Sequence, residues 1–298
     1  MDNFLLILFF VGLGWLFRHI KAFPGQTAQV LNLFVLYVAL PAVILLKIPQ
    51  LSISTDMIVP IAVAWSMLPF SVLLILLGAR RYKWSRETIG VLLLVIPVGN
   101  TSFMGLPMVN AFFGETGIPY LIMYDQLGTL LIFVTYGSVI LAIYGSKGQV
   151  RYAQIVRQAL LFPPTIALVL GLALRSWEYP DLLVRQLQIM ADMLTPLVMV
   201  AIGFQLSIRI SSGVLYPLGF GLVVKMALAP IFALAGCHIL GLKGLATEIA
   251  IFEAGMPPMV TAGAVAIAAD MHPELAAALV SLGLALAFVT LPALYWLI

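Results

Sequence analysis

The chain has 298 residues, of which 63% are hydrophobic and only 9% are charged, and its mean hydropathy is +1.12. Average proteins carry about 25% charged residues, so the composition predicts a helical membrane protein and leaves no hydrophilic stretch long enough for a soluble domain. The single cysteine, Cys237, excludes an internal disulfide, and the net charge of +3 gives no sign of nucleic-acid binding.

Ten apolar segments follow one another along the chain, each with the length and composition of a membrane-spanning helix. We number them as spans one to ten, at about residues 4–20, 27–48, 57–79, 88–113, 117–144, 158–176, 187–207, 213–240, 246–269 and 273–298. The first segment starts close to Met1 and has no small-residue cleavage site, which predicts a retained helix rather than a signal peptide. The predicted fold class is therefore an all-α membrane protein with ten transmembrane helices.

The charges between the spans predict the orientation in the membrane. Loops on one side hold ten basic residues and loops on the other side hold four. The first set is Arg18, Lys21, Arg80, Arg81, Lys83, Arg86, Lys147, Arg151, Arg157 and Arg209, and the second is Lys47, Arg175, Arg185 and Lys243. Because cytoplasmic loops have an excess of Lys and Arg, we expect the first set in the cytoplasm and both termini on the outer side of the cytoplasmic membrane.

The two halves of the chain resemble each other. The matching pairs are Gln50-Leu51-Ser52-Ile53 with Gln205-Leu206-Ser207-Ile208, Pro41 with Pro196, Pro69 with Pro230, Glu87 with Glu248, and Pro97 with Pro258. Five spans per half is an odd number, so the second half enters the membrane from the opposite side. This predicts an inverted repeat, with residues 1–144 as the first five-helix repeat, 145–157 as a cytoplasmic linker and 158–298 as the second repeat. Inverted repeats with broken helices are typical of secondary transporters.

Span four is interrupted at its centre. Pro97 and Pro107 have no N–H to donate, and Gly99 and the polar triplet Asn100-Thr101-Ser102 lie between them. Backbone groups freed by such a break are tolerated at membrane depth only inside protein or beside a water-filled cavity. We therefore expect a helix break here that forms half of a transport site.

Span nine has the corresponding break. Its centre contains Gly255, the tandem prolines Pro257 and Pro258, and the hydroxyl of Thr261. Two broken helices related by an in-plane twofold can cross at their breaks, and each second half-helix then presents free N–H groups and a positive dipole end to the centre. Such a crossing is suited to bind a carboxylate.

Several motifs resemble one known family. They are Asn32-Leu33-Phe34-Val35 with Leu40-Pro41, Asn100-Thr101 with Met104-Gly105-Leu106-Pro107, Met256-Pro257, His272-Pro273-Glu274, Leu291-Pro292 and Tyr295. Together they resemble the auxin efflux carrier family, which includes the plant PIN-formed auxin exporters and bacterial relatives often labelled malate permeases. Two features depart from the plant carriers: Gly99 replaces a proline before Asn100, and the long central cytosolic loop is missing. A prokaryotic-type organic acid carrier therefore fits better than a carrier of the plant hormone.

The resemblance implies a five-plus-five inverted repeat in which the broken helices four and nine cross. It also implies a scaffold domain of helices 1, 2, 6 and 7 and a transport domain of helices 3–5 and 8–10. Elevator-type alternating access, an organic anion as substrate and a homodimer formed through the scaffold helices are further expectations from the family.

The expected substrate-binding residues gather around the two breaks. They are Asn100, Thr101, Ser102, Gly99, Gln126, Thr261, Lys225 and Asn32, with Pro97, Pro107, Gly255, Pro257 and Pro258 forming the breaks. Lys225 is either the charge that attracts the anion or one half of a structural ion pair, and Asn32 either bridges helices or faces the substrate.

Ionisable groups at membrane depth are costly, so each is a functional hypothesis. Asp125 and Glu253 are candidates for coupling to a proton or cation; alternatively, Asp125 caps a helix near the interface and Glu253 caps freed backbone groups. Asp192 is expected near the start of its helix, paired with the helix dipole. The histidines show no metal-ligand spacing, so no metal site is expected.

These observations predict a secondary transporter that moves a small organic anion, such as a malate- or auxin-like carboxylate, across the cytoplasmic membrane. No nucleotide-binding loop or cofactor is expected, so an H⁺, Na⁺ or substrate gradient would supply the energy. The alternative is a membrane sensor that binds the same ligand in the same pocket without transport. A channel is less favoured, and an intramembrane enzyme least, because no nucleophile–base pair or metal set is present. The expected partners are the anion and the lipid bilayer, without nucleic acid.

Overall fold

The computed structural model describes residues 2–50, 55–145, 157, 160–206 and 212–298. Within these residues every regular element is a helix, and the only β feature is one isolated bridge, so the predicted all-helical class is confirmed. The main α-helices are α1 Asp2–Phe17, α2 Thr27–Phe34, α3 Leu40–Lys47, α4 Ile58–Tyr82, α5 Arg86–Val95, α6 Leu106–Phe113, α7 Ile118–Met123, α8 Leu131–Tyr144, α10 Pro163–Ala173, α11 Asp181–Asp192, α12 Leu194–Gln205, α13 Leu215–Val223, α14 Ala229–Ile239, α15 Leu245–Ala254, α16 Val260–Ala268 and α17 Pro273–Tyr295.

Six helical stretches in the described part of the chain are long and apolar enough to cross a membrane. They are Thr27–Lys47, Thr55–Tyr82, Glu115–Tyr144, Asp181–Gln205, Leu215–Ile239 and Pro273–Tyr295. Two shorter apolar helices, Asn3–Phe17 and Pro163–Ala173, coincide with the expected spans one and six. Spans four and nine fall on interrupted helices, α5 with α6 and α15 with α16. The count of ten spans and the inverted repeat stay predictions.

Span seven begins earlier than expected, at Asp181 rather than near residue 187, so Asp192 is the last residue of α11. It also lies two residues before α12 begins at Leu194, and its carboxylate accepts a hydrogen bond of 2.7 Å from Gln188 one turn earlier. The pairing of Asp192 with a helix dipole stays a prediction. The predicted linker 145–157 and the repeated Leu51-Ser52-Ile53 and Ser207-Ile208 lie almost entirely outside the described residues, as do Lys147, Arg151 and Arg209.

Prolines lie where several of these helices begin or change type. In α10 and α17 a proline occupies the first position of a new helix, where its missing N–H costs little because the first N–H groups of a helix have no intrahelical acceptor. In α3, α6 and α14 a proline occupies the second position, directly after a π-helical turn that continues into the α-helix. Pro69 is different, since α4 continues through it.

Four π-helical turns interrupt the α-helices in the described residues: η1 Val35–Ala39, η3 Thr101–Gly105, η5 Tyr124–Leu130 and η7 Val224–Leu228. The short 3₁₀ turns are η2 Thr55–Met57, η4 Glu115–Gly117 and η6 Ser212–Val214. π-helical turns are rare and occur frequently at functional sites. Three of the four contain a residue that the sequence marks as a candidate: Thr101, Asp125 and Lys225.

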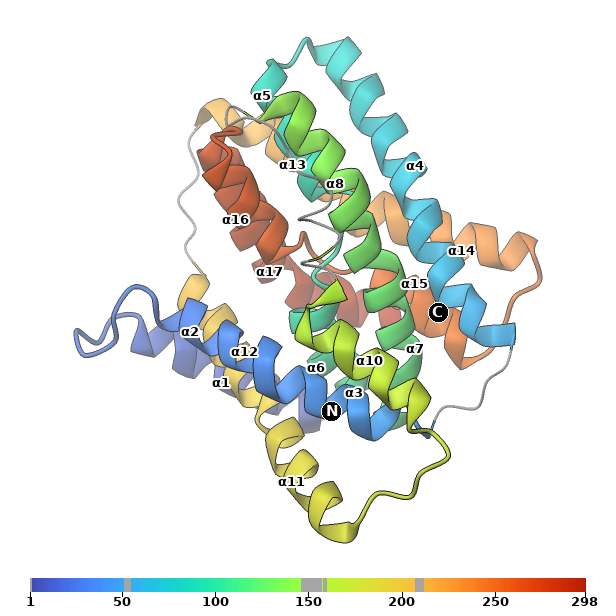
Figure 1. The fold of residues 1–298 in the computed structure, drawn as a ribbon. Helices are drawn as coiled ribbons and strands as arrows, with labels where there is room; N and C mark the ends of the chain where they lie inside the picture. Colours follow the sequence, from blue (N-terminus) through green and yellow to red (C-terminus); the bar gives the residue numbers. More distant parts are fainter. Residues whose placement is uncertain (1, 51–54, 146–156, 158–159, 207–211) are drawn as a thin grey trace.

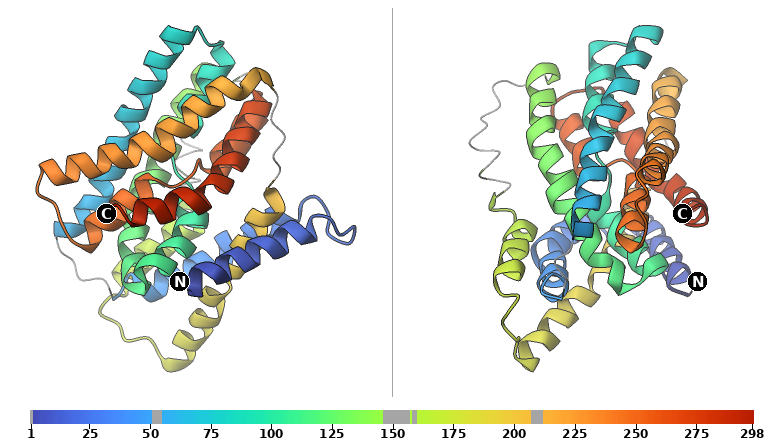
Figure 2. Two further views of the ribbon diagram at one scale, coloured as in Figure 1. Left: turned by 180° about the vertical axis from the view of Figure 1, so that it is seen from behind. Right: turned by 90° about the vertical axis from the view of Figure 1, so that its right-hand side faces the viewer.

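The helices form two groups. The lower group consists of α1, α2, α3, α10, α11 and α12, which lie together in the lower part of Figure 1 and keep together in both views of Figure 2. All other helices and turns from η2 to α8 and from η6 to α17 form the upper group, of which α6 and α7 lie next to the lower group. Helices α1 and α12 pack closely, since a methyl group on Gly14 would lie 2.1 Å from the Val200 carbonyl oxygen and one on Gly203 would lie 2.0 Å from that of Val11. Small residues allow this approach. Whether the groups act as scaffold and transport domains stays a prediction.

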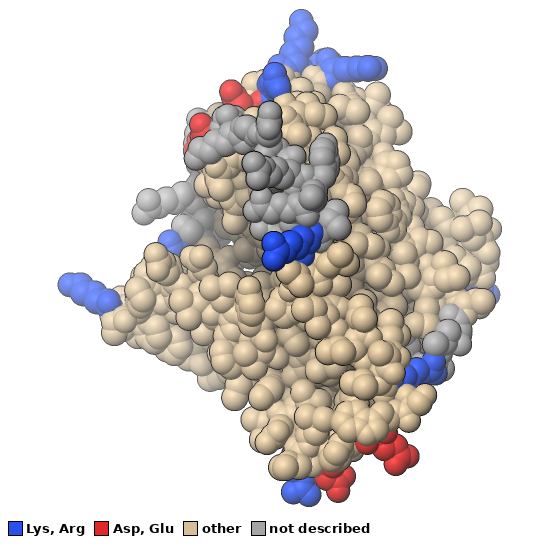
Figure 3. Space-filling view, viewed as in Figure 1, with Lys and Arg blue, Asp and Glu red and all other residues tan. Residues whose placement is uncertain are grey.

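The outer surface is mostly apolar. Figure 3 shows a face that is largely uncharged, with its charged side chains mainly near the margins. Large hydrophobic side chains are exposed on the outer surface of the molecule, among them Leu5, Phe9, Leu182 and Val289. A surface of this kind is suited to lipid, in which a charged side chain at the bilayer centre is costly.

Candidate functional site

The two interrupted helices meet at their breaks. Helix α5 ends at Val95 and η3 begins at Thr101, while α15 ends at Ala254 and α16 begins at Val260. Between these ends Gly99 and Pro258 form an antiparallel bridge. The Asn100 N–H donates to the Pro257 carbonyl at 2.8 Å, and the Met259 N–H donates to the Val98 carbonyl at 3.3 Å. Backbone groups that lose their helical partners at the breaks therefore bond to each other, as buried backbone polar groups must.

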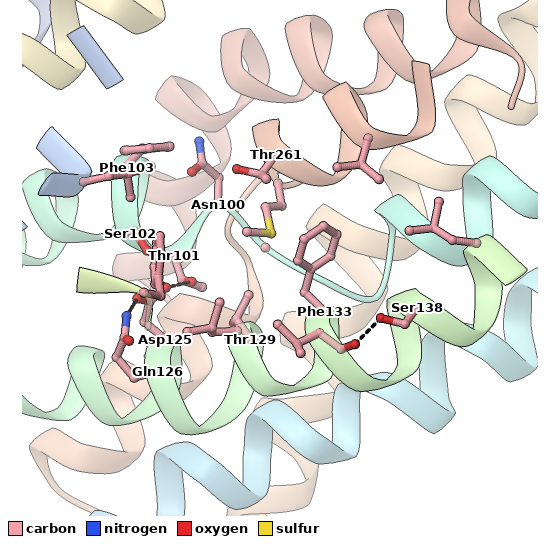
Figure 4. Close-up of a pocket in the computed structure, with 18 residues that line it drawn as sticks. Asn100, Thr101, Ser102, Phe103, Asp125, Gln126, Thr129, Phe133, Ser138 and Thr261 are labelled. Atoms are coloured by element: carbon pink, nitrogen blue, oxygen red, sulfur yellow. Dashed lines mark hydrogen bonds between the residues drawn. The ribbon is translucent and has the colours of Figure 1, made fainter. Parts of the chain in front are cut away.

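A cavity of about 370 Å³ lies beside this junction (Figure 4). Its polar lining comes from Asn100, Thr101, Ser102, Asp125, Gln126, Thr129, Ser138 and Thr261. Its apolar lining includes Leu36, Phe103, Phe133, Phe162 and Met259. The cavity thus brings together both breaks, the π-turn η5 and residues of the lower helix group.

Asp125 is the centre of a hydrogen-bonded cluster in the wall of the cavity. Its Oδ1 accepts hydrogen bonds from the hydroxyls of Thr101 and of Ser102, the latter at 2.7 Å, and its Oδ2 accepts one from the Gln126 amide at 2.7 Å. Thr165 of α10 donates to the other end of the Gln126 amide at 3.4 Å. The carboxyl is 4% exposed, and three donors of this kind offset much of the cost of its burial. The cluster joins the first turn after the break to η5.

Asn100 contributes a hydrogen-bond donor that no described residue accepts. Its side-chain Nδ2 is buried and without a partner, although the residue lines the cavity. Its own carbonyl receives the N–H groups of Met104 and Gly105, both at 3.1 Å. A buried amide donor without an acceptor is costly, so the Asn100 side chain has an unused hydrogen bond at the junction.

Lys225 lies behind the junction and does not line the cavity. Its side chain is 1% exposed, and its Nζ donates to the carbonyl of Ala254, the last residue of α15, at 3.1 Å. A cation at a helix C-terminus interacts favourably with the helix dipole. A methyl group on Gly99 would lie 3.3 Å from the same Nζ, so the ammonium packs directly against the break. Lys225 forms no ion pair with a described residue, because Lys47–Glu115 is the one salt bridge found among them.

Glu253 is the most deeply buried ionisable group at the junction. It is 0% exposed, and neither carboxyl oxygen has a hydrogen-bond partner among the described residues. The carboxyl packs against the backbone of Gly105 in η3, where an added methyl group would lie 2.7 Å from Oε1. Like Lys225, it lies outside the lining of the cavity.

The structure brings together seven of the expected residues in the cavity: Gly99, Asn100, Thr101, Ser102, Asp125, Gln126 and Thr261. Asn32 lies on α2, partly buried, and does not line this cavity; Leu36, one helical turn later, does. Among the break residues, Pro107 is at the second position of α6, and Gly255 directly follows α15. Pro97 lies in the non-helical segment before η3.

Sequence reasoning missed the apolar and distal part of the cavity, although a signal existed. Leu130, Val134, Ser138 and Leu141 follow Gln126 at spacings of three or four residues, so they share one face of η5 and α8. Phe162 precedes α10 and has no such signal, because only the tertiary packing brings it to the cavity.

The chain is similar to known membrane transport proteins. The model of the Membrane transport protein family matches residues 1–295. An uncharacterized transporter of Methanocaldococcus jannaschii is 28% identical over 268 residues, which cover 86% of this chain and 85% of that protein. An uncharacterized transporter of Methanothermobacter thermautotrophicus is 25% identical over 294 residues, covering 98% and 96%.

The family match spans almost the whole chain, so it includes both breaks and the cavity between them. It indicates a transporter rather than an enzyme, and it confirms the family resemblance that the motifs predicted. This chain therefore belongs to the Membrane transport protein family, which is the auxin efflux carrier family, and is an integral membrane transporter.

Proposed function

We propose that the protein is a secondary transporter that moves a small organic anion across the cytoplasmic membrane by elevator-type alternating access, with both termini on the outer side. The substrate binds in the cavity beside the two helix breaks. The observation that carries this proposal is the cavity of about 370 Å³ itself, whose wall combines residues of both breaks, among them Asn100, a side chain whose Nδ2 has no acceptor among the described residues.

A carboxylate is the ligand that suits this donor. The first N–H groups of η3 and of α16 add positive partial charge at the junction. Thr261, in the first turn of α16, lines the cavity. Asp125 would repel an anion, and the positive ends of three donor dipoles from Thr101, Ser102 and Gln126 reduce this repulsion without cancelling the charge.

The residues that line the cavity favour a ligand with a single carboxylate and an otherwise apolar structure. Phe103, Phe133 and Phe162 contribute aromatic surface, and no Lys or Arg is among the described residues that line the cavity. A second carboxylate would therefore find no cation to pair with in the described part of the lining. We expect aromatic monocarboxylates to bind more tightly than dicarboxylates such as malate.

The position of the cavity supports alternating access. Leu36 and Phe162 belong to the lower helix group, whereas the breaks and η5 belong to the upper group. A sliding of the upper group, as the transport domain, against the lower group, as the scaffold, would change the side from which the cavity is reached. Crossing helix breaks at the interface of an inverted repeat are typical of such carriers.

The test is uptake of radiolabelled indole-3-acetate and malate into proteoliposomes, corrected for protein-free liposomes. Asn100→Ala and Pro257→Ala should each reduce uptake at least tenfold, because the first removes the free donor and the second changes the segment that pairs with Asn100. Ser281→Ala is the matched control, since its hydroxyl bonds only to the Ala277 carbonyl on α17, away from the cavity. Uptake that is unaffected by both site variants would show that the substrate binds elsewhere.

A further inference from the structure

Glu253 is buried in a way that an ionised carboxylate does not tolerate. The residue is 0% exposed, both oxygens lack a hydrogen-bond partner among the described residues, and it lies at membrane depth in the broken span nine. An unpaired ion in such surroundings is far more costly than a neutral carboxylic acid, and the group binds a proton instead. Asp125 is also buried but differs from Glu253, because three donors stabilise its charged form.

The surrounding charges lead to the same assignment. Three titratable groups interact electrostatically with Glu253 within the described part of the chain: Asp125 and Tyr124 of η5 and Lys225 of η7. Lys225 is directed to the Ala254 carbonyl and forms no ion pair with Glu253. The charges of Lys225 and Asp125 balance each other, so the buried junction is neutral when Glu253 holds a proton and carries one excess negative charge when it does not.

The contact with Gly105 connects this proton to the substrate site. The carboxyl of Glu253 packs against the last residue of η3, and the first residues of η3, Thr101 and Ser102, hold Asp125 at the cavity wall. Loss of the proton would place a charge beside this five-residue turn, with no donor facing it. The turn and the two breaks would then have to rearrange to solvate the charge.

We propose that Glu253 binds a proton in this conformation and is the proton site of a proton-coupled transport cycle. One proton from water on one side of the membrane converts the carboxylate to the acid, the neutral junction moves with the bound anion, and the proton leaves to water on the other side. This rests on the transport function proposed above and selects Glu253 over Asp125, and a proton over Na⁺, among the coupling alternatives.

Infrared spectroscopy of the purified protein in lipid nanodiscs tests the proton site without any substrate. The wild type should show the carbonyl stretch of a protonated, dry carboxyl group, and Glu253→Gln should lack it. Glu248→Gln, on the first turn of the same helix, and Asp125→Asn should retain it. Incorporation of ¹³C-labelled glutamate into the wild type should shift the band, which identifies a glutamate even if a variant fails to fold.

The proposal is wrong if the infrared band persists in Glu253→Gln, or if ¹³C-labelled glutamate does not shift it. It is also wrong if the wild type shows no such band between about pH 5 and 8, the range in which an ordinary carboxyl is ionised. A carboxylate band that responds to added Na⁺ would likewise reject the proton in favour of a bound cation.

Transport then tests the coupling separately. In proteoliposomes, an inward proton gradient should raise the initial uptake of radiolabelled indole-3-acetate by the wild type and by Glu248→Gln at least fivefold above protein-free liposomes. Glu253→Gln should retain exchange without a gradient but lose this increase. A gradient-driven increase in Glu253→Gln would disprove the coupling role. If the wild type shows the infrared band but transports neither indole-3-acetate nor malate, the proton site is supported and the proposed transport function is rejected.

Discussion

At the scale of single residues, the site depends on a few side chains that the first turn after the break directs toward η5. Thr101 and Ser102 both donate to Asp125, and Asn100 is left with a free amide. The polar triplet and the Asp125–Gln126 pair are visible in the sequence because polar groups are rare in such an apolar chain. The sequence did not separate the residues on the cavity side of the junction from Lys225 and Glu253 behind it.

Thr101→Val tests the hydroxyl cluster. The change keeps the shape of the side chain but removes one of the three donors to Asp125, and a hydrogen bond to a charged group contributes about 1.5–3 kcal/mol. We expect a loss of stability of that size in the thermal unfolding of the detergent-solubilised protein, together with weaker binding of indole-3-acetate.

Thr135→Val is the control for this substitution. Thr135 is exposed on α8 and its hydroxyl donates to the Leu131 carbonyl of the same helix, so its loss should change stability by less than about 0.5 kcal/mol. Equal effects of the two substitutions would contradict a special role for the Asp125 cluster.

At the scale of elements, prolines and polar residues in the sequence indicate where helices begin and break. The π-helical turns were not predicted, since a single inserted residue leaves no composition signal and is stabilised by what packs around it. Their effect is large: η5 places Asp125, Gln126 and Thr129 on the cavity, and η7 contains Lys225.

One ion pair joins an element of the lower helix group to one of the upper group. Lys47 ends α3, Glu115 begins η4, and their charged atoms are 2.5 Å apart. Glu115 is 67% exposed, so the pair should contribute only about 0.2–1 kcal/mol. If the two helix groups slide past each other during transport, the ion pair stabilises the conformation seen in this structure.

Charge reversal tests the pair. Lys47→Glu and Glu115→Lys alone should each change the initial uptake rate up to about fivefold, since 1.4 kcal/mol corresponds to a factor of ten in an equilibrium, while thermal stability should change little. The double variant should restore the wild-type rate because it recreates the pair with reversed polarity. A double variant as altered as the single ones would show that the pair does not control the balance between conformations.

At the scale of the whole molecule, the distribution of charge predicts how the chain lies in the membrane. Lys83 follows α4 and Lys243 precedes α15, and both are exposed at helix ends. The excess of basic residues on the side of Lys83 predicts that this side is cytoplasmic.

Single-cysteine labelling in intact cells tests the orientation. In a Cys237→Ala background, Lys243→Cys should react with a membrane-impermeant maleimide and Lys83→Cys should react only after the membrane is permeabilised. The reverse pattern would place both termini in the cytoplasm and invert the proposed topology. Cys237 itself is buried, so its removal should leave the helix arrangement intact.

The sequence by itself determined the helical membrane class, the family, the approximate bounds of the apolar segments and the two breaks. These properties depend on local composition: hydrocarbon requires long apolar segments, and a proline in a helix interior removes a backbone hydrogen bond, so closely spaced prolines and glycines favour a break. Tertiary structure alone decided that Gly99 and Pro258 pair, that Phe162 and Leu36 close the cavity, and that Lys225 and Glu253 lie behind it. Such contacts join residues distant in the chain, and their geometry depends on how whole helices pack rather than on any local pattern.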